Sequence, residues 1–236
     1  MVRARDVAGA ARRWVLMGWW WVLDYLFVLG WQVRALRRGA DPAHYLRGEG
    51  ARAPDVVLLP GVYEPWRFLL PVAERLRVRG HAVHLLPELA WNSAPVPAAA
   101  DAVLGLLRDR DLRDVVLLAH SKGGLIGKHL MGRDEGRVRA MVAVNTPFGG
   151  SVYARWFPVD ALRAFRPDDP TVMSLARDVA PNARVVSAYS CFDPHVPQGS
   201  HLPGARNVVL RTPGHFRALA DPDLVGVVVS VLDDGP

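Results

Sequence analysis

From residue 54 onward, short runs of aliphatic and β-branched residues alternate with longer segments in which apolar residues recur every three or four positions. This alternation is typical of a parallel sheet built from βαβ units. The apolar runs predict six strands, over residues 55–62, 81–87, 114–120, 138–147, 183–190 and 207–213. The helical periods predict helices over about 64–79, 98–108 and 121–131, and a last helix within 215–234.

One connection in this pattern is much longer than the others. Residues 148–182 separate the fourth and fifth predicted strands and carry the aromatic residues Tyr153, Trp156, Phe157 and Phe165. Long insertions over the strand ends of such sheets often act as lids, although helices that only pack there are nearly as common. We therefore expect a small helical lid in this insertion.

The first 50 residues follow a different pattern. Residues 14–31, WVLMGWWWVLDYLFVLGW, contain one charged residue, Asp24, and five of the eight tryptophans in the chain. As a helix this segment would be about 27 Å long, close to the thickness of the hydrocarbon core of a bilayer. Arginines flank it on both sides, which leaves its orientation in a membrane undetermined.

Three interpretations of residues 14–31 remain open. The segment can span a membrane, lie in the membrane interface, or pack as a Trp-rich helix on the domain or on a second subunit. Asp24 argues against a span exposed to lipid, because a carboxylate at the centre of a bilayer costs about 2.5–3.5 kcal/mol. We expect a membrane-associated protein, on an undetermined side of the membrane, and otherwise a cytoplasmic one.

The composition limits the number of domains and the classes of ligand that the chain can be expected to bind. The chain has 236 residues, half of them hydrophobic, which suits one α/β domain over residues 51–236 behind the N-terminal segment 1–50. The net charge of +6 comes from scattered arginines without a nucleic-acid motif, so nucleic-acid binding is not expected. One cysteine excludes an intramolecular disulfide and a cysteine-based zinc site. No metal-ligand or nucleotide-loop spacing occurs, so no cofactor is expected, and self-association is left open.

Three residues with complementary chemistry follow three of the predicted strands. Ser121 follows the third strand, Asp193 the fifth and His215 the sixth. The carboxyl ends of parallel strands meet at one edge of a sheet, where ligands bind. A serine hydroxyl becomes a nucleophile when an imidazole accepts its proton, and a carboxylate orients that imidazole. The order Ser, Asp, His along the chain therefore predicts a catalytic triad.

The turn around Ser121 also predicts an oxyanion hole. In a sharp strand–turn–helix, Gly123 lets the neighbouring backbones approach, and the N–H of Lys122 at the helix start can donate to an oxyanion. The Lys122 side chain is expected in solvent or at the mouth of the pocket. Gly61 lets the loop after the first strand bend, and Val62 is the preferred second donor.

Other interpretations of these residues stay open at this stage. Ser121 could be only the N-cap of the following helix. His120 is expected to support the turn rather than to catalyse. The competing acids are Asp160, Asp168 and Asp221, and the competing bases are His195 and His201.

The motifs resemble those of the α/β-hydrolase superfamily, and within it the lipases and esterases. AHSKGG resembles the nucleophile elbow, LLPGVY the oxyanion loop and VNTPFGGS the stretch after the next strand, while FDPHVP and GHF resemble the acid and histidine loops. The resemblance covers about residues 54–232. The chain departs from the pattern at Ala119, the place of the first elbow glycine, and at Pro60, where lipases often have histidine, so that Tyr63 is an alternative to Val62 as donor.

The resemblance implies an α/β-hydrolase fold with a mainly parallel sheet of about six strands and helices on both faces. It implies a serine hydrolase that cleaves carboxylic esters through an acyl-enzyme, with a lipidic substrate suggested by the aromatic insertion and the Trp-rich N-terminus. Acyl transfer by the same triad is one alternative. A non-catalytic, membrane-associated protein of the same fold is another.

Overall fold

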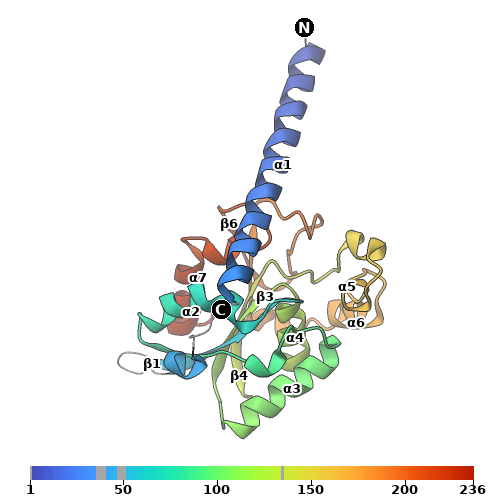
Figure 1. Cartoon of the computed structure of the whole chain (residues 1–236). Coiled ribbons are helices and arrows are strands. Elements are labelled where there is room, and N and C mark those ends of the chain that lie inside the picture. The colour runs from blue at the N-terminus through green and yellow to red at the C-terminus, as the bar shows by residue number, and fades with distance from the viewer. Residues whose placement is uncertain (1, 36–40, 47–51, 134–135) are drawn as a thin grey trace.

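A computed structural model describes residues 2–35, 41–46, 52–133 and 136–236 of the chain (Figure 1). Its centre is a six-stranded sheet in which every neighbouring pair is parallel. The order is β2-β1-β3-β4-β5-β6, which confirms the predicted fold class. The strands are β1 (Arg52–Leu59), β2 (His81–His84), β3 (Val115–His120), β4 (Val138–Val144), β5 (Val185–Ser190) and β6 (Arg206–Leu210).

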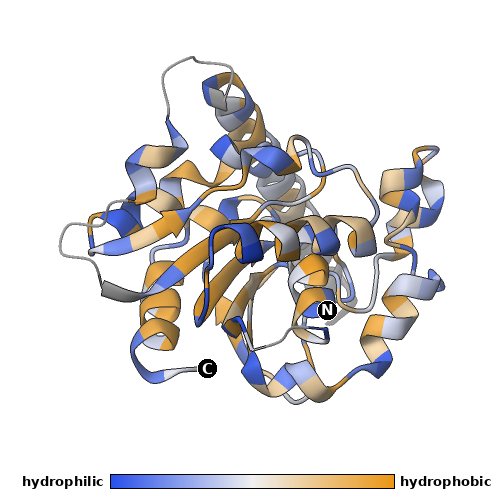
Figure 2. Cartoon of the chain, turned by 90° about the horizontal axis from the view of Figure 1, so that it is seen from below, coloured by the Kyte–Doolittle hydropathy of each residue, from blue (hydrophilic) through white to orange (hydrophobic). Residues whose placement is uncertain are grey.

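Helices cover both faces of this sheet, and Figure 2 shows the apolar strands between them. One face packs against α2 (Leu70–Arg77) and α7 (Leu224–Asp234), and the other against α3 (Val96–Asp109) and α4 (Lys122–Met131). Strands buried on both faces read as continuous apolar runs, and all six residues of β3 are buried. This layering places the end of β3, and Ser121 after it, in the middle of the sheet edge.

Several predicted elements extend past the observed ends. The first strand ends at Leu59, because Pro60 cannot donate to the sheet ladder. The predicted helix over 64–79 begins as a 3-10 turn, η2 (Trp66–Leu69), before α2. The last helix, predicted within 215–234, is α7, and the 3-10 turn η6 (Arg217–Ala220) precedes it, with Pro222 between the two.

The insertion 148–182 is a set of short helices: η4 (Val152–Trp156), α5 (Asp160–Arg163), α6 (Pro170–Arg177) and η5 (Ala180–Arg184). The remaining 3-10 turns are η1 (Pro42–Leu46) and η3 (Pro87–Leu89). Phe165 is buried against the core, whereas Trp156 is 79% exposed. The insertion is therefore fixed to the domain along one side and carries aromatic surface on the other.

The N-terminal helix α1 (Val2–Ala35) has two differently placed halves. Its second half packs on the domain, where Phe27, Val28 and Trp31 contact the core beside α2 and α7. Its first half projects away from the domain (Figure 1), and Trp14 is 72% exposed. Within the described residues, one helix, over Trp14–Arg34, is long and apolar enough to cross a membrane.

Candidate active site

Ser121 occupies a strained turn between β3 and α4. Its backbone has φ 50° and ψ −116°, a conformation that non-glycine residues rarely adopt away from functional sites. Its N–H donates to the carbonyl of Val144 at 2.8 Å, which fixes the turn to the neighbouring strand. Although Ser121 stands at the N-cap position of α4, its side chain makes no capping hydrogen bond. The hydroxyl of Ser121 therefore does not cap the helix in this structure.

The elbow can form only because its glycines admit neighbouring atoms. A Cβ on Gly123 would lie 2.3 Å from the carbonyl oxygen of Leu59, and one on Gly124 would lie 1.9 Å from Thr146 Oγ1. The first contact is with backbone of β1, which cannot rotate away. This close packing presses the start of α4 against the sheet edge.

Asp193 and His215 form a buried pair beside the elbow. His215 Nδ1 and Asp193 Oδ2 lie 2.7 Å apart, and the two side chains are 5% and 4% exposed. The second oxygen of Asp193 accepts the backbone N–H groups of His195 at 2.8 Å and Val196 at 3.0 Å. Both oxygens of the carboxylate are thus engaged in hydrogen bonds, and Oδ2 orients the imidazole of His215.

The pair also shifts the titration of both groups. Burial raises the pKa of Asp193, but the charge of His215, its hydrogen bond and the two backbone N–H groups leave that pKa below its usual value. Burial lowers the pKa of His215, yet Asp193, with smaller contributions from Glu64 and Asp24, holds it above its ordinary value. A base of this kind holds a proton that it has accepted more firmly than a solvated histidine.

The backbone around His215 is held by two side chains that the sequence did not single out as catalytic. Asn145, at the end of β4, donates from Nδ2 to the carbonyls of His215 at 2.8 Å and Gly214 at 3.1 Å. His120 Nε2 lies 3.0 Å from the same His215 carbonyl, and its Nδ1 lies 2.9 Å from Glu64 Oε2. Because a carbonyl only accepts, Nε2 of His120 carries the proton, and Nδ1 faces a carboxyl group.

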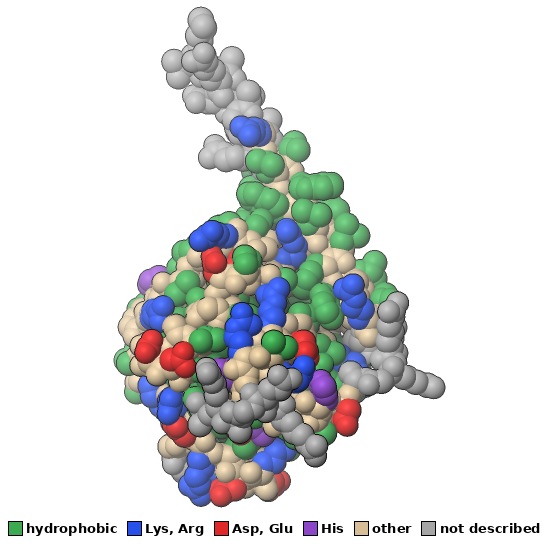
Figure 3. Space-filling view, turned by 90° about the vertical axis from the view of Figure 1, so that its left-hand side faces the viewer, with side chains coloured by type: hydrophobic (Ala, Val, Ile, Leu, Met, Phe, Trp, Pro, Cys, Tyr) green, Lys and Arg blue, Asp and Glu red, His purple; other side chains and the backbone are tan. Residues whose placement is uncertain are grey.

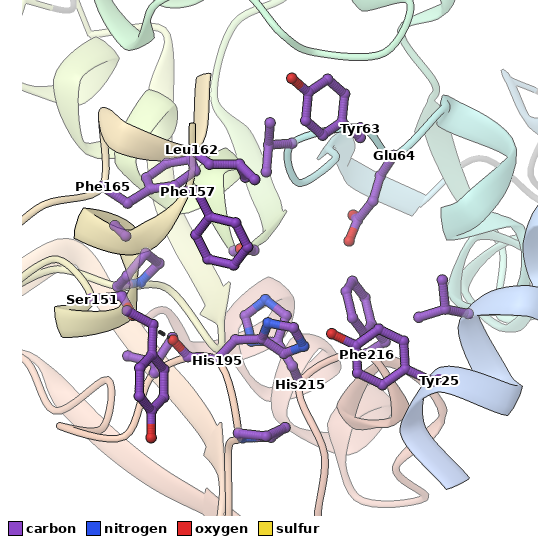
Figure 4. Close-up of a pocket in the computed structure, with 18 of the residues that line it drawn as sticks. Tyr25, Tyr63, Glu64, Ser151, Phe157, Leu162, Phe165, His195, His215 and Phe216 are labelled. Carbon is purple, nitrogen blue, oxygen red and sulfur yellow. Dashed lines mark hydrogen bonds between the residues drawn. The ribbon is translucent and has the colours of Figure 1, made fainter. Parts of the chain in front are cut away.

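Ser121 and His215 open into one cavity of about 570 Å³, which Figure 4 shows in close-up. No direct hydrogen bond joins these two side chains among the described contacts, as is common in sites without a bound substrate. His195 also lines the cavity, with its ring centroid 4.9 Å from that of His215. Burial lowers the pKa of His195 to about 3, so this imidazole stays neutral and cannot replace His215 as a base near neutral pH.

The backbone N–H groups of the loop after β1, which holds the two candidate second donors, differ in their hydrogen-bond partners. The N–H of Tyr63 donates to the carbonyl of Trp91 at 2.7 Å, and that of Gly61 to Glu64 Oε2 at 2.7 Å. Val62 lies between them and lines the cavity together with Ser121. With the Tyr63 and Gly61 N–H groups engaged, Val62 is the better candidate donor, beside the N–H of Lys122 at the start of α4.

The side chain of Lys122 is not where the sequence suggested. It is 2% exposed, and Nζ donates to the carbonyl of Asn92 at 2.6 Å and to that of Ala94. Burial lowers the pKa of this ammonium to about 8. Lys122 therefore fastens the loop after β2 beneath the elbow, instead of reaching solvent or the pocket mouth.

The competing acids lie outside the cavity, and so does the other competing base, His201, which is exposed. Asp160 is fully exposed, and Asp168 is paired with Arg166 on the surface at 2.9 Å. Asp221 is buried, but it accepts the backbone N–H groups of Thr212 and Asp223, so it caps a turn. Among the residues the structure describes, no group of three His, Cys, Asp or Glu side chains could hold a metal ion.

Comparison with known proteins gives a likeness of fold. No protein-family model and no curated protein matches the chain. An extracellular α/β-hydrolase from a Paenibacillus species matches 77% of this chain over 100% of its own length, with a TM-score of 0.55 and 18% identity. The mature form of a Bacillus licheniformis lipase matches 82% of this chain over 99% of its own, with a TM-score of 0.57 and 15% identity.

A third structure points the same way. A monoacylglycerol lipase from Paleococcus ferrophilus matches 79% of this chain over 96% of its own, with a TM-score of 0.57 and 14% identity. Identities this low carry the likeness of fold and not of substrate. Together with the strand order and the elbow at the end of β3, they show that the chain has the α/β-hydrolase fold.

Proposed function

We propose that the protein is a serine hydrolase that cleaves carboxylic esters with an apolar acyl part. The observation that carries the proposal is the convergence on one cavity of Ser121, on a strained turn, and of His215, paired with a buried Asp193. Strained backbone persists where the surrounding structure enforces it, most often at functional sites. The proposal is also supported by the fold, because the structures of similar fold include lipases.

In the proposed reaction, Ser121 Oγ attacks the ester carbonyl while His215 Nε2 takes its proton. Asp193 keeps the Nδ1 proton in place and stabilises the imidazolium. The N–H groups of Val62 and Lys122 receive the oxyanion. His215 then returns the proton to the leaving alcohol, and a water molecule, activated by the same imidazole, attacks the acyl-enzyme and releases the acid.

The cavity wall supports an apolar acyl group. Most of the lining side chains are aromatic or aliphatic, and the insertion contributes a set of them: Tyr153, Phe157, Leu162 and Phe165. Figure 4 shows Phe157 above the two histidines. The volume of the cavity lies within the range of small-molecule sites. Its apolar wall is the basis for proposing a lipidic ester as substrate.

The primary test is covalent labelling by a fluorophosphonate probe together with turnover of p-nitrophenyl esters of graded chain length. Ser121→Ala should abolish both, and Ser151→Ala, which changes another serine of the same cavity, should keep the labelling. Labelling that persists in Ser121→Ala would refute the proposal that Ser121 is the nucleophile. Product analysis with added alcohols separates hydrolysis from acyl transfer. A folded wild-type protein with neither labelling nor turnover would favour the non-catalytic alternative.

We further propose that the enzyme works at a membrane surface reached by α1. Figure 3 shows hydrophobic side chains along the projecting helix, and Trp14, Trp19 and Leu29 are 72%, 57% and 60% exposed. Tryptophan prefers the membrane–water interface. Replacing Trp14 and Trp19 by Asp should abolish co-sedimentation with vesicles of phosphatidylcholine and phosphatidylglycerol. Val179→Asp, at an exposed apolar position far from α1 in sequence, is the control that should still sediment.

A further inference from the structure

The N-terminal helix supplies a buried carboxylate to the loop that carries His215. Asp24 is 0% exposed, and its Oδ2 accepts the backbone N–H of His215 at 2.9 Å. Its Oδ1 accepts the N–H groups of Phe216 at 3.0 Å and Arg217 at 2.9 Å. Phe216 is the N-cap residue of η6 and Arg217 is its first residue, so Asp24 caps that turn from a helix that lies 191 residues before His215 in the chain.

The approach of Asp24 depends on the residue before His215. A Cβ on Gly214 would lie 2.4 Å from Asp24 Oδ1, and Gly214 itself has φ +119°. Any side chain at this position would displace the carboxylate. The histidine loop and α1 therefore fit each other closely.

We propose that Asp24 is a positioning residue for His215, and that α1 is consequently a working part of the active site. The inference rests on the proposed role of His215 as general base. Asp193 holds the ring of His215, and Asn145 and His120 hold its carbonyl, whereas Asp24 holds its N–H. An imidazole that must transfer protons to and from Ser121 tolerates little displacement, because errors of about 1 Å can cost ~100-fold in rate.

The same helix also forms part of the cavity wall. Trp21, Tyr25, Val28 and Gln32, which follow one another on a single helical stripe, all line the cavity. Figure 4 shows Tyr25 directed from α1 into the cavity beside Phe216. Gln32 Nε2 donates to the carbonyl of Tyr63 at 3.3 Å, so α1 also contacts the loop that carries the candidate oxyanion donor. A displacement of α1 would therefore affect His215, the cavity wall and this loop together.

Asp24 has an electrostatic effect that its packing alone would not have. Burial lowers the pKa of His215, and the negative charge of Asp24 is one of the contributions that raise it, after those of Asp193 and Glu64. Removing this charge lowers the pKa of His215, so the neutral imidazole persists to lower pH. The acid limb of the kcat/KM profile then moves toward lower pH. A merely structural role would leave that limb in place.

The test compares two variants of the full-length protein, purified in detergent. Asp24→Asn keeps the shape of the side chain but leaves one oxygen for three N–H donors. We expect its kcat per serine titrated by fluorophosphonate to fall about 10- to 100-fold, with a similar KM, and its acid limb to move to lower pH. Asp24→Glu keeps the charge and changes the geometry, so kcat should fall while the acid limb stays close to that of the wild type.

The matched control is Leu26→Asn, an exposed position on the same part of α1, which should leave both quantities unchanged. Wild-type kcat per titrated serine and a wild-type acid limb in Asp24→Asn would overturn the inference, even if less protein folds. Titration counts only functional sites, so reduced folding does not hide the result. Failure of the proposed function can be distinguished from failure of this inference, because it would show as labelling that persists in Ser121→Ala.

Discussion

Replacing Asp193 by Asn should abolish most of the proposed activity without disturbing the fold. The reason is the orientation that the site imposes on the new amide. Two backbone N–H groups, of His195 and Val196, face one oxygen of Asp193 at 2.8 and 3.0 Å. In Asp193→Asn the amide oxygen must take that place. The NH₂ group then points at His215 Nδ1, at the position now occupied by an oxygen 2.7 Å away.

This arrangement reverses the tautomer of His215. Nδ1 becomes an acceptor and the proton moves to Nε2, which can no longer take the proton of Ser121. The loss expected for such a tautomer change is ~10⁴-fold in kcat, or about 5 kcal/mol of transition-state stabilisation. The measurement is kcat for p-nitrophenyl ester hydrolysis per mole of folded protein, with thermal unfolding to check the fold.

Asp169 offers a matched control. It accepts the N–H groups two and three residues ahead, Thr171 at 2.8 Å and Val172 at 3.3 Å, as Asp193 does, but it caps α6 outside the cavity. Asp169→Asn should keep wild-type kcat. If Asp193→Asn retained kcat within ~10-fold of the wild type, Asp193 would not be the acid that orients His215 and the triad assignment would be wrong.

Three further predictions concern the base and the elbow. The acid limb of kcat/KM for the wild type should report an apparent pKa above 6.5, because the net effect of the surroundings raises the pKa of His215 and activity is lost as pH falls through it. Gly123→Ala should lower the free energy of unfolding by about 1–3 kcal/mol, measured by urea denaturation, since its Cβ would meet the Leu59 carbonyl at 2.3 Å. The pKa of Lys122 is about 8 in the fold and about 10.5 in the unfolded chain, so between these values the unfolded state binds the extra proton. The stability of the wild type relative to Lys122→Met should therefore rise by ~3 kcal/mol from pH 8 to 10.5, and a flat difference would contradict a depressed pKa.

The sheet and its loops were predictable because their signals are local. A strand buried on both faces is a continuous apolar run wherever it occurs, and the connections of a parallel sheet then bring Ser121, Asp193 and His215 to one edge. The boundaries were less predictable. Apolar residues of the turns after β1 and β2 extend the same runs past the observed strand ends, so the pattern alone gives strands that are too long.

The side chains that support the site could not be placed in the same way. Glu64 and His120 are 56 residues apart in the chain, and each looks unremarkable in its own segment. Lys122 was expected near solvent because lysine is rarely buried, and nothing near it in sequence indicates the two loop carbonyls that receive it. One signal did exist for Asp24: a lone carboxylate in an apolar helix needs a partner, although the sequence does not say which.

The position of Asp24 changes how the N-terminal segment should be tested. A helix that only anchors the enzyme can be removed without loss of chemistry, and deletion of residues 1–40 would then release an active domain. In the structure that deletion also removes the acceptor of the His215 N–H and four side chains of the cavity wall. Loss of activity after the deletion would therefore say nothing about a membrane. The exposed tryptophans, Trp14 and Trp19, lie before the packed half of α1, so replacing them separates the two roles: membrane binding should be lost while turnover of a soluble ester persists. If turnover fell with membrane binding, the projecting and packed halves of α1 would be coupled, and engagement of the membrane would itself set the position of Asp24.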